Sequence, residues 1–187
     1  ADGTLLNREA AASHNITVRA TSTDGSTADT SFTINVNDLD EFDVTAPVDA
    51  NAAGNAVNEN AANGTTVGVT ASASDADATN NTVTFSLTNS AGGRFAIDAN
   101  TGVVTVADGT LLDREAAASH NITVRASSSD GSTADSSFTI NVNDVDEFDV
   151  SAPADANAAA NAVNENAANG TTVGVTASAS DADATNN

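Results

Sequence analysis

The chain has 187 residues, 26 of them acidic and 5 basic, and a formal net charge of −21. It contains no Cys, Met, Trp or Tyr, and its six aromatic residues are all Phe. Nucleic acid and anionic lipid repel a polyanion of this density, and a chain without cysteine forms no disulfide scaffold, zinc finger or thiol nucleophile. No apolar run is long enough to span a bilayer. We therefore expect no nucleic-acid partner and no membrane insertion.

A long internal repeat sets the organisation of the chain. Residues 1–81 recur as residues 107–187 with eight differences, of which only Asn7 against Asp113 changes the charge. The period of 106 residues has the length of an independently folded domain and is too long for a solenoid repeat. We interpret the chain as an excerpt of a tandem array. The expected units are the C-terminal part of a module (1–41), a complete module (42–147) and the N-terminal part of the next (148–187).

Short segments in which polar and apolar residues alternate predict β-strands. Within one period, in chain order, the segments are residues 56–59, 65–71, 82–88, 94–97, 103–106, 121–126 and 138–142. Clusters of Asn, Asp, Gly and Ser separate them, and only residues 114–119 favour a short helix. About seven short strands in roughly 100 residues predict an all-β fold, a two-sheet antiparallel sandwich.

Acidic residues gather in four short clusters in each period. The clusters are Asn-Glu-Asn at 58–60, Asp-Ala-Asp at 75–77, Asp-Arg-Glu at 113–115 and a run over 141–147. One interpretation is a set of solvated loops that keep the protein soluble. The other is a cation site, because calcium takes six to eight oxygens from carboxylates, amides and carbonyls, and an Asp-x-Asp pair in an extended loop directs both carboxylates to one side. We favour the cation site.

In order along the chain, these motifs resemble the cadherin repeat. Glu59 in N-E-N is followed by D-A-D, by F-A-I-D-A-N-T-G at 95–102, by L-D-R-E at 112–115 and by I-N-V-N-D at 140–144. The resemblance covers the whole period and implies tandem seven-stranded Greek-key β-sandwich modules, one complete and two partial. The composition and the near-identical copies also resemble bacterial giant surface adhesins of the RTX type, whose cadherin-like modules act as extenders.

The resemblance implies calcium, two or three ions, at each junction between modules. At the first junction the implied ligands are Glu9, Asn35, Asn37, Asp38, Asp40, Asp75 and Asp77. At the second they are Glu59, Asp113, Glu115, Asn141, Asn143, Asp144, Asp146, Asp181 and Asp183. Glu165 is the strand glutamate of the following module and is implied as a ligand by the same correspondence.

Three departures from the family pattern bear on the number of ions. Asn7 stands where the Asp-Arg-Glu motif has its aspartate, so the first junction lacks one carboxylate. The linker reads N-V-N-D-V, with its first and last family positions changed, and the acidic residues Asp40 and Asp146 are candidates to compensate. A later family ligand falls at Ser22 and Ser128, with Asp24 and Asp130 two residues further on.

Mutual repulsion of the junction carboxylates predicts that a junction opens without cations and stiffens with them. The sequence thus favours a calcium-stiffened extender of a long extracellular adhesin or filament, serving cell adhesion or biofilm formation at the cell surface. The alternative is that the modules themselves bind surface carbohydrate or like modules on other cells. Identical chains assembling into a fibre are a third arrangement that fits the repeat.

Catalysis is not expected. Paired carboxylates hydrolyse glycosides in some enzymes, but here they recur at every junction without an aromatic platform for a sugar. The single His of each period, His14 and His120, has no second nitrogen or sulfur ligand and is interpreted as structural. Arg114 is expected to pair with neighbouring carboxylates.

Overall fold

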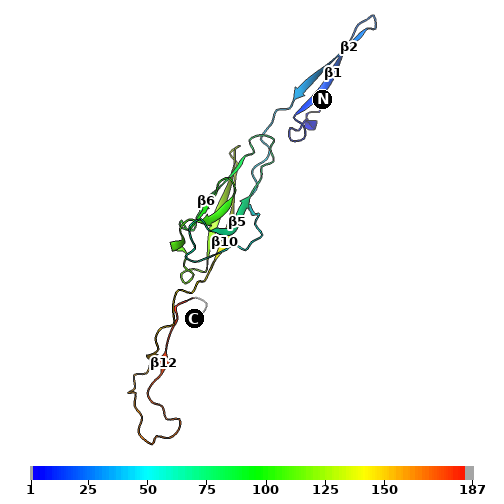
Figure 1. Ribbon diagram of the computed structural model, residues 1–187. Helices are drawn as coiled ribbons and strands as arrows, with labels where there is room; N and C mark the ends of the chain where they lie inside the picture. The colour runs from blue at the N-terminus through cyan, green and yellow to red at the C-terminus, as the bar shows by residue number, and fades with distance from the viewer. Residues whose placement is uncertain (1, 184–187) are drawn as a thin grey trace.

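The computed structural model describes residues 2–183 and shows an elongated chain of β-strands in three consecutive parts (Figure 1). The first part holds η1 (Gly3–Leu5), β1 (Ser13–Thr21) and β2 (Thr27–Asn35). The central part holds β3 (Val48–Asp49), β4 (Ala56–Asn58), β5 (Thr66–Ser72), β6 (Val83–Asn89), β7 (Phe95–Ile97), β8 (Val103–Val106), η2 (Gly109–Leu111), β9 (Ser119–Ser128) and β10 (Thr133–Asn143). The last part holds β11 (Ala154–Asp155) and β12 (Ala177–Ser178).

Two four-stranded sheets form the central part. One has the strand order β4-β10-β9-β6 and the other β3-β5-β8-β7. All neighbours are antiparallel except β4 and β10, which run parallel. The predicted all-β Greek-key sandwich is confirmed, and all seven predicted strands are present. The sequence missed the two-residue strand β3, and the expected antiparallel pattern is wrong for the β4–β10 pair.

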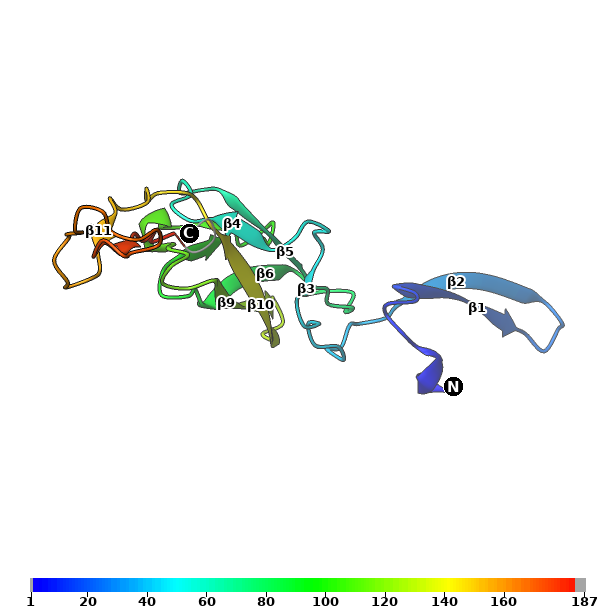
Figure 2. The same cartoon turned by 90° about the horizontal axis from the view of Figure 1, so that it is seen from below.

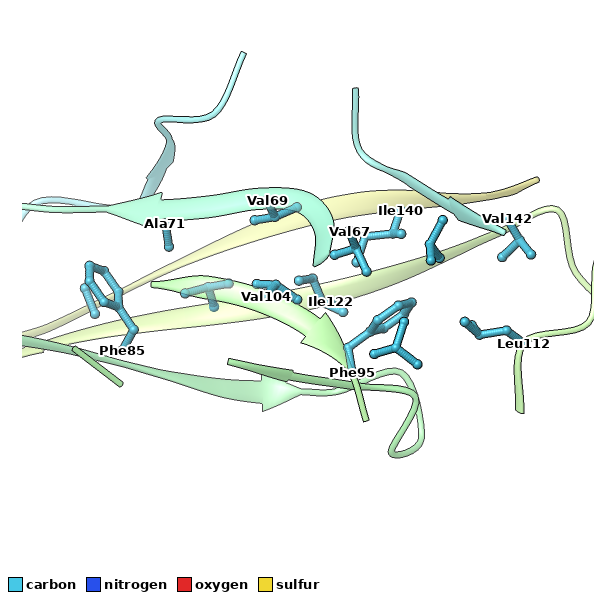
Figure 3. Close-up of a cluster of buried hydrophobic side chains, with 14 of the residues drawn as sticks. Val67, Val69, Ala71, Phe85, Phe95, Val104, Leu112, Ile122, Ile140 and Val142 are labelled. Carbon is cyan, nitrogen blue, oxygen red and sulfur yellow. The ribbon is translucent and has the colours of Figure 1, made fainter. Parts of the chain in front are cut away.

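The core lies between these two sheets (Figure 3). Valines of β5 and β8, including Val67, Val69 and Val104, face Ile122 of β9 and Ile140 of β10, and each of these side chains is almost fully buried. Alternation of buried and exposed residues along β5, β8 and β9 produces this arrangement, as the period of two in the sequence predicts. Burial of each of these apolar side chains stabilises the fold by about 1.5–3 kcal/mol, and together they are the main source of its stability.

Hairpin β1–β2 repeats hairpin β9–β10 without the rest of the sandwich. Its register, from Ser13 opposite Asn35 onward, is the register of β9–β10 displaced by one period. Ile16 and Ile34 are about half exposed here, whereas the equivalent Ile122 and Ile140 are buried. Figure 2 shows the hairpin standing apart from the central sandwich. The hairpin conformation is therefore local, and burial of its inner face requires the second sheet.

Two glycines permit close approaches of the backbone within the second sheet. Gly68 has a φ of +87° at an irregularity of β5, and a Cβ placed there would lie 2.3 Å from the carbonyl oxygen of Gly54. Gly102 has a φ of +69°, and a Cβ would lie 2.1 Å from the Ala71 carbonyl oxygen. Because Gly102 has no Cβ, the two backbones approach closely enough for the Ala71 N–H to donate a hydrogen bond to the Gly102 carbonyl, which connects the β7–β8 turn to β5.

The segment at 114–119, expected to be helical, is not. Residues 114–116 form a turn, closed by a bond from the Ala117 N–H to the Asp113 carbonyl, and β9 begins at Ser119. No α-helix occurs in the described part of the chain, residues 2–183, and so no helix there is long and apolar enough to cross a membrane. The boundaries of the three expected units, at residues 42 and 148, stay a prediction.

Candidate metal centre

The Asp-Ala-Asp loops hold the linkers that precede them. Asp77 is 2% exposed, and its two carboxylate oxygens accept hydrogen bonds from the N–H groups of Glu41 (3.2 Å) and Phe42 (3.3 Å). Asp183 repeats this arrangement with Glu147 (3.1 Å) and Phe148 (3.3 Å). Within each loop the first aspartate accepts from the N–H of the second, which fixes the turn. Each linker is thereby fastened to the module that follows it.

Glu59 fastens the linker to the module that precedes it. The side chain is 3% exposed and accepts from the Arg114 N–H (2.6 Å) through one oxygen and from the Val145 N–H (2.7 Å) through the other. It stands at the end of β4, which pairs with the end of β10, so the strand pairing brings it to the start of the linker. A buried carboxylate needs such bonds, because burial without partners is costly.

Three groups of carboxylates form around these fixed points. In each group one oxygen per residue lies within 4.8 Å of the others. At the second junction the group comprises Glu59, Glu115 and Glu147. At the first junction there are two groups that share Asp77, namely Glu9 with Glu41, and Asp40 with Asp130.

The group of the second junction borders a hollow of about 200 Å³. Its lining includes Glu59, Asp113, Glu115 and Glu147, so the Asp-Arg-Glu loop, the strand glutamate and the linker meet there. Carboxylates contributed by separate segments of chain around one space are a suitable oxygen donor set for a hard divalent cation.

The Asp-Arg-Glu turn is built by its first two residues. Asp113 Oδ1 accepts from the Ala116 N–H (2.8 Å), and Asn7 Oδ1 makes the equivalent bond to the Ala10 N–H (2.6 Å), so the asparagine preserves the turn while removing the charge. The expected pairing of Arg114 with neighbouring carboxylates stays a prediction, and in the equivalent first-period position a hydrogen bond with Thr79 and, to a lesser extent, the charge of Arg8 lower the pKa of Asp38. Arg114 Nη1 donates to the carbonyl oxygens of Ala118 and Val142, which joins the start of β9 to the end of β10.

The linker residues divide into two sets. Asn35 ends β2, and Asn141 lies within β10, where it pairs with Ala56 of β4. Asn143 ends β10 and donates from Nδ2 to Asn58 Oδ1 (3.0 Å). The side chains of these three asparagines and of Asn37 stay predicted ligands, because the groups described above consist of carboxylates only. Because β10 extends to residue 143, the linker proper starts at Asp144, and its later acidic residues reach the groups.

Sequence reasoning missed Glu41 and Glu147 and named Asp130 only as a residue near a family position. The signal was present, because Glu147 belongs to the quoted acidic run 141–147. Asp38, which was predicted, accepts through one oxygen from both the N–H and the hydroxyl of Thr79. Glu165, also predicted, is exposed and belongs to none of the groups found among residues 2–183.

Electrostatics at the junctions disfavour the ionised form of several linker carboxylates, whereas hydrogen bonds with Thr79 and Ser128 lower the pKa of Asp38 and of Asp75, respectively. Desolvation raises the pKa of Asp40, and the charges of Asp130 and Asp77 raise it further. Desolvation likewise raises the pKa of Glu147, with contributions from Glu59 and Glu115.

Neighbouring acids act in the same sense elsewhere in the linkers. A hydrogen bond with the Asp183 carboxyl, together with its charge, raises the pKa of Asp146. Desolvation and the charge of Glu9 raise the pKa of Glu41. These directions are the ones expected where several acids are gathered in a partly desolvated site.

Two further oxygens fit a cation. Asp38 Oδ1 and Asp75 Oδ2 are buried and receive no hydrogen bond in the described part of the chain. A buried carboxylate oxygen without a donor is unfavourable unless a cation or water meets it. The donor set is oxygen-rich and lacks sulfur, which suits calcium more than zinc or copper.

Residues 55–143, which form most of the central sandwich, match the family model described as the cadherin domain. Cadherin domains are extracellular, non-enzymatic adhesion domains, in agreement with the prediction that the chain is not an enzyme. The comparison with curated proteins gave no match.

Solved structures of cadherins share the fold. The mouse cadherin-23 EC22-24 structure is 27% identical, with a TM-score of 0.69 over 95% of this chain and 56% of that chain. The mouse clustered PcdhgC3 EC1-3 structure is 26% identical, with a TM-score of 0.60 over 74% of this chain and 46% of that one. A protocadherin gammaB7 EC3-6 cis-dimer structure, at 23% identity, has a TM-score of 0.69 over 95% and 44%. The chain thus spans about half the length of the cadherin-23 chain that it matches.

Proposed function

We propose that the chain is a calcium-stiffened structural extender of a long extracellular adhesin or filament, with calcium at both junctions. The observation that carries the proposal is the convergence of carboxylates from the linker and from a module at each junction, with raised pKa values in the linker residues. Bound calcium would neutralise these carboxylates and supply the positive charge that the site lacks.

The chain's own bonds explain how a junction transmits stiffness. Glu59 holds the start of the second linker through the Val145 N–H, and Asp183 holds its end through the Glu147 and Phe148 N–H groups. Only residues 144–148 lie between the end of β10 and the last of these contacts. Without a cation, repulsion among Glu59, Glu115 and Glu147 acts against these few bonds. Neutralisation removes the repulsion and leaves the bonds, so the two units are held in one orientation.

The proposal includes the boundaries at residues 42 and 148 and the predicted ligands, to which we add Glu41, Asp130 and Glu147. We expect two or three ions at a complete junction. The bacterial origin and the role in biofilm adhesion rest on the composition and the near-identical copies, which the sequence resemblance alone supports.

The alternative function is a module that itself binds carbohydrate or like modules. The cis-dimer named for the protocadherin gammaB7 structure is a precedent for contact between cadherin domains. Against a sugar site, the exposed face of the β4-β10-β9-β6 sheet carries hydroxyls and the Arg125–Asp135 ion pair but no Trp or Tyr for stacking. A spacer role needs no such platform, and repeated copies are what a spacer requires.

Equilibrium titration with calcium, paired with small-angle scattering, tests the proposal. We expect saturable binding at the junctions and a longer, stiffer particle when calcium is bound than when a chelator is present. If calcium binds and the dimensions stay the same, calcium binding is supported and the extender mechanism is refuted. If no calcium binds, the acidic groups are solvated loops.

A further inference from the structure

His120 is a titratable side chain of the central sandwich that takes no part in the carboxylate groups. It lies on β9 two residues before Ile122, so the alternation of the strand directs it to the same face, toward the core. Its paired neighbour on β10 is Ile140, whose side chain is fully buried. From the other sheet, the ring of Phe95 in β7 lies with its centroid 6.3 Å from that of the imidazole, and the two planes are tilted by 59°. The imidazole thus stands at the edge of the apolar core.

The buried nitrogen of the imidazole has no hydrogen-bond partner. Nε2 of His120 is buried, and within residues 2–183 neither a donor nor an acceptor meets it. A neutral imidazole carries one donor and one acceptor nitrogen, and protonation makes both of them donors. A protonated ring would place a positive charge and an unpaired N–H group where no acceptor receives them, which is costly in a desolvated position. The folded module therefore favours the neutral ring.

The nearby positive charge favours the neutral ring as well. Burial lowers the pKa of His120, and the charge of Arg94 lowers it further. The guanidinium of Arg94 donates to the carbonyl oxygens of Leu111 (2.8 Å) and Ala91 (2.8 Å), and these bonds fix the position of its charge. The Phe95 ring offers an imidazolium little attraction, because its centroid lies beyond the distance of about 6 Å at which cations interact with an aromatic face.

In the described part of the chain, the strands around His120 bring no carboxylate to the imidazole. β6, β7 and β8 carry no charged side chain. The one acid of β10, Asp135, forms an ion pair with Arg125, which the alternation of β9 places on the opposite face of the sheet. In the loop before β9, Asp113 accepts a backbone N–H bond of its own turn, and Arg114 donates to backbone carbonyls. Glu115 belongs to the carboxylate group of the second junction.

We propose that His120 is an acid-sensitive element of the module, and that protonation of its imidazole weakens the packing of β9 against β7. Above the ordinary histidine pKa of about 6.5, the ring is neutral in the folded and in the unfolded chain, and its contribution to stability is complete. As the pH falls below that value, the unfolded chain takes up the proton more readily than the folded chain, so the free energy of unfolding decreases. The decrease ends once the pH has passed the lowered pKa of His120 in the folded module.

The same histidine stands in both copies of the repeat. His14 and His120 each lie in the sequence Ser-His-Asn-Ile-Thr-Val. Proton uptake would therefore act on every module of a tandem array. For the array, the consequence rests on the proposed extender function: mild acid loosens the rod within its modules, separately from the junctions that bind calcium.

Titration of the histidine side chains by nuclear magnetic resonance, on the full chain in EDTA, measures the proton uptake directly. The chain has two histidines, and a His14→Gln variant assigns each signal. Thermal melts by circular dichroism in EDTA, from about pH 5 to about pH 7.5, then compare the parent with His120→Gln over the range that spans an ordinary histidine pKa. His120→Phe, which keeps a ring beside Phe95, is a second variant that cannot titrate. The acidic residues are the same in all these proteins, so the difference between their melts reports on position 120.

We expect His120 to take up its proton at a lower pH than a histidine of the unfolded chain. We also expect the Tm of the parent to fall further than that of either variant as the pH is lowered, with a difference of several degrees. A His120 that titrates at the ordinary value or above it would overturn the buried neutral state, and this result needs no variant at position 120. Equal falls of Tm in the parent and the variants would overturn the acid-sensitive role. Because EDTA is present throughout, each result is independent of whether the junctions bind calcium.

Discussion

Glu59→Gln is the substitution that separates the structural role of the strand glutamate from its role at a cation site. The change keeps the size of the side chain, removes its charge, and replaces one acceptor oxygen by an NH₂ group. Two bonds are affected, those from the Arg114 and Val145 N–H groups. Glutamine satisfies one of them and places a donor against the other.

The magnitude follows from these bonds and from the charges nearby. A hydrogen bond to a charged group contributes about 1.5–3 kcal/mol, and removing a charge beside Glu115 and Glu147 returns part of that loss, so we expect about 1–2 kcal/mol of destabilisation without calcium. A ligand at a hundred times its Kd stabilises the folded state by about 2.7 kcal/mol. The variant loses most of this calcium stabilisation, so with calcium its free energy of unfolding is about 4 kcal/mol below that of the parent.

Circular dichroism melts in calcium and in EDTA measure both terms, since the chain has no Trp or Tyr for fluorescence. In a domain of this size a loss of about 1 kcal/mol lowers Tm by about 4–8 °C. Glu165→Gln is the matched control, because the same residue stands there in an exposed segment outside the carboxylate groups. If calcium stabilises the Glu59→Gln variant as much as the parent, Glu59 is not a ligand. If Glu165→Gln loses as much calcium stabilisation as Glu59→Gln does, the contribution of Glu59 does not depend on the group formed with Glu115 and Glu147.

Three further outcomes are expected. Asn7→Asp should tighten calcium binding at the first junction several-fold, because it restores a carboxylate without disturbing the hydrogen bond of the turn. Calcium titration of the variant and the parent measures the difference; identical affinities would contradict a calcium ligand at position 7. Because the pKa values of Asp40 and Glu147 are raised, the ion-free fold is most stable below about pH 4 to 5 with respect to these groups, and that stability falls as the pH rises through the raised pKa values. Carboxyls with lowered pKa values, such as Asp75 and Asp98, contribute in the opposite sense, so the decline is read as the difference between EDTA melts of the parent and of an Asp40→Asn, Glu147→Gln variant. Calcium affinity should rise with pH; a difference that does not change with pH, or an affinity that does not, would contradict this reasoning. Gly102→Ala should lower the free energy of unfolding by more than Gly93→Ala, whose Cβ meets nothing within 4 Å, the latter costing about 1–2 kcal/mol for its positive φ alone; equal losses in urea would refute the close contact with Ala71.

Strand prediction succeeded where a side-chain period exists to be read. In 65–71 and 138–142 the apolar residues of the alternation pack between the sheets, so the pattern itself indicates which side chains are buried. Strand β3 has only two residues and no period, and its place depends on pairing with β5, which no local signal encodes. The parallel pairing of β4 with β10 is likewise a property of the assembled sheets.

The carboxylate groups were predicted in their module residues more completely than in their linker residues. Glu59, Glu115 and Asp77 follow from motifs within a module and lie in the carboxylate groups. In the linker, the resemblance directed attention to N-V-N-D, whereas β10 continues through Asn143 and carries the acidic run forward, so that Glu147 joins the group. The point at which a strand ends fixes which linker side chains reach the site, and that point is set by pairing with β4.

The most direct test of a calcium-stiffened extender is a calcium titration by isothermal calorimetry with parallel small-angle scattering on the whole chain. We predict saturable binding and an increase in the maximum dimension of the particle over the same range of calcium concentration. Saturable binding without extension would contradict the mechanical role, and the absence of binding would contradict the calcium site itself.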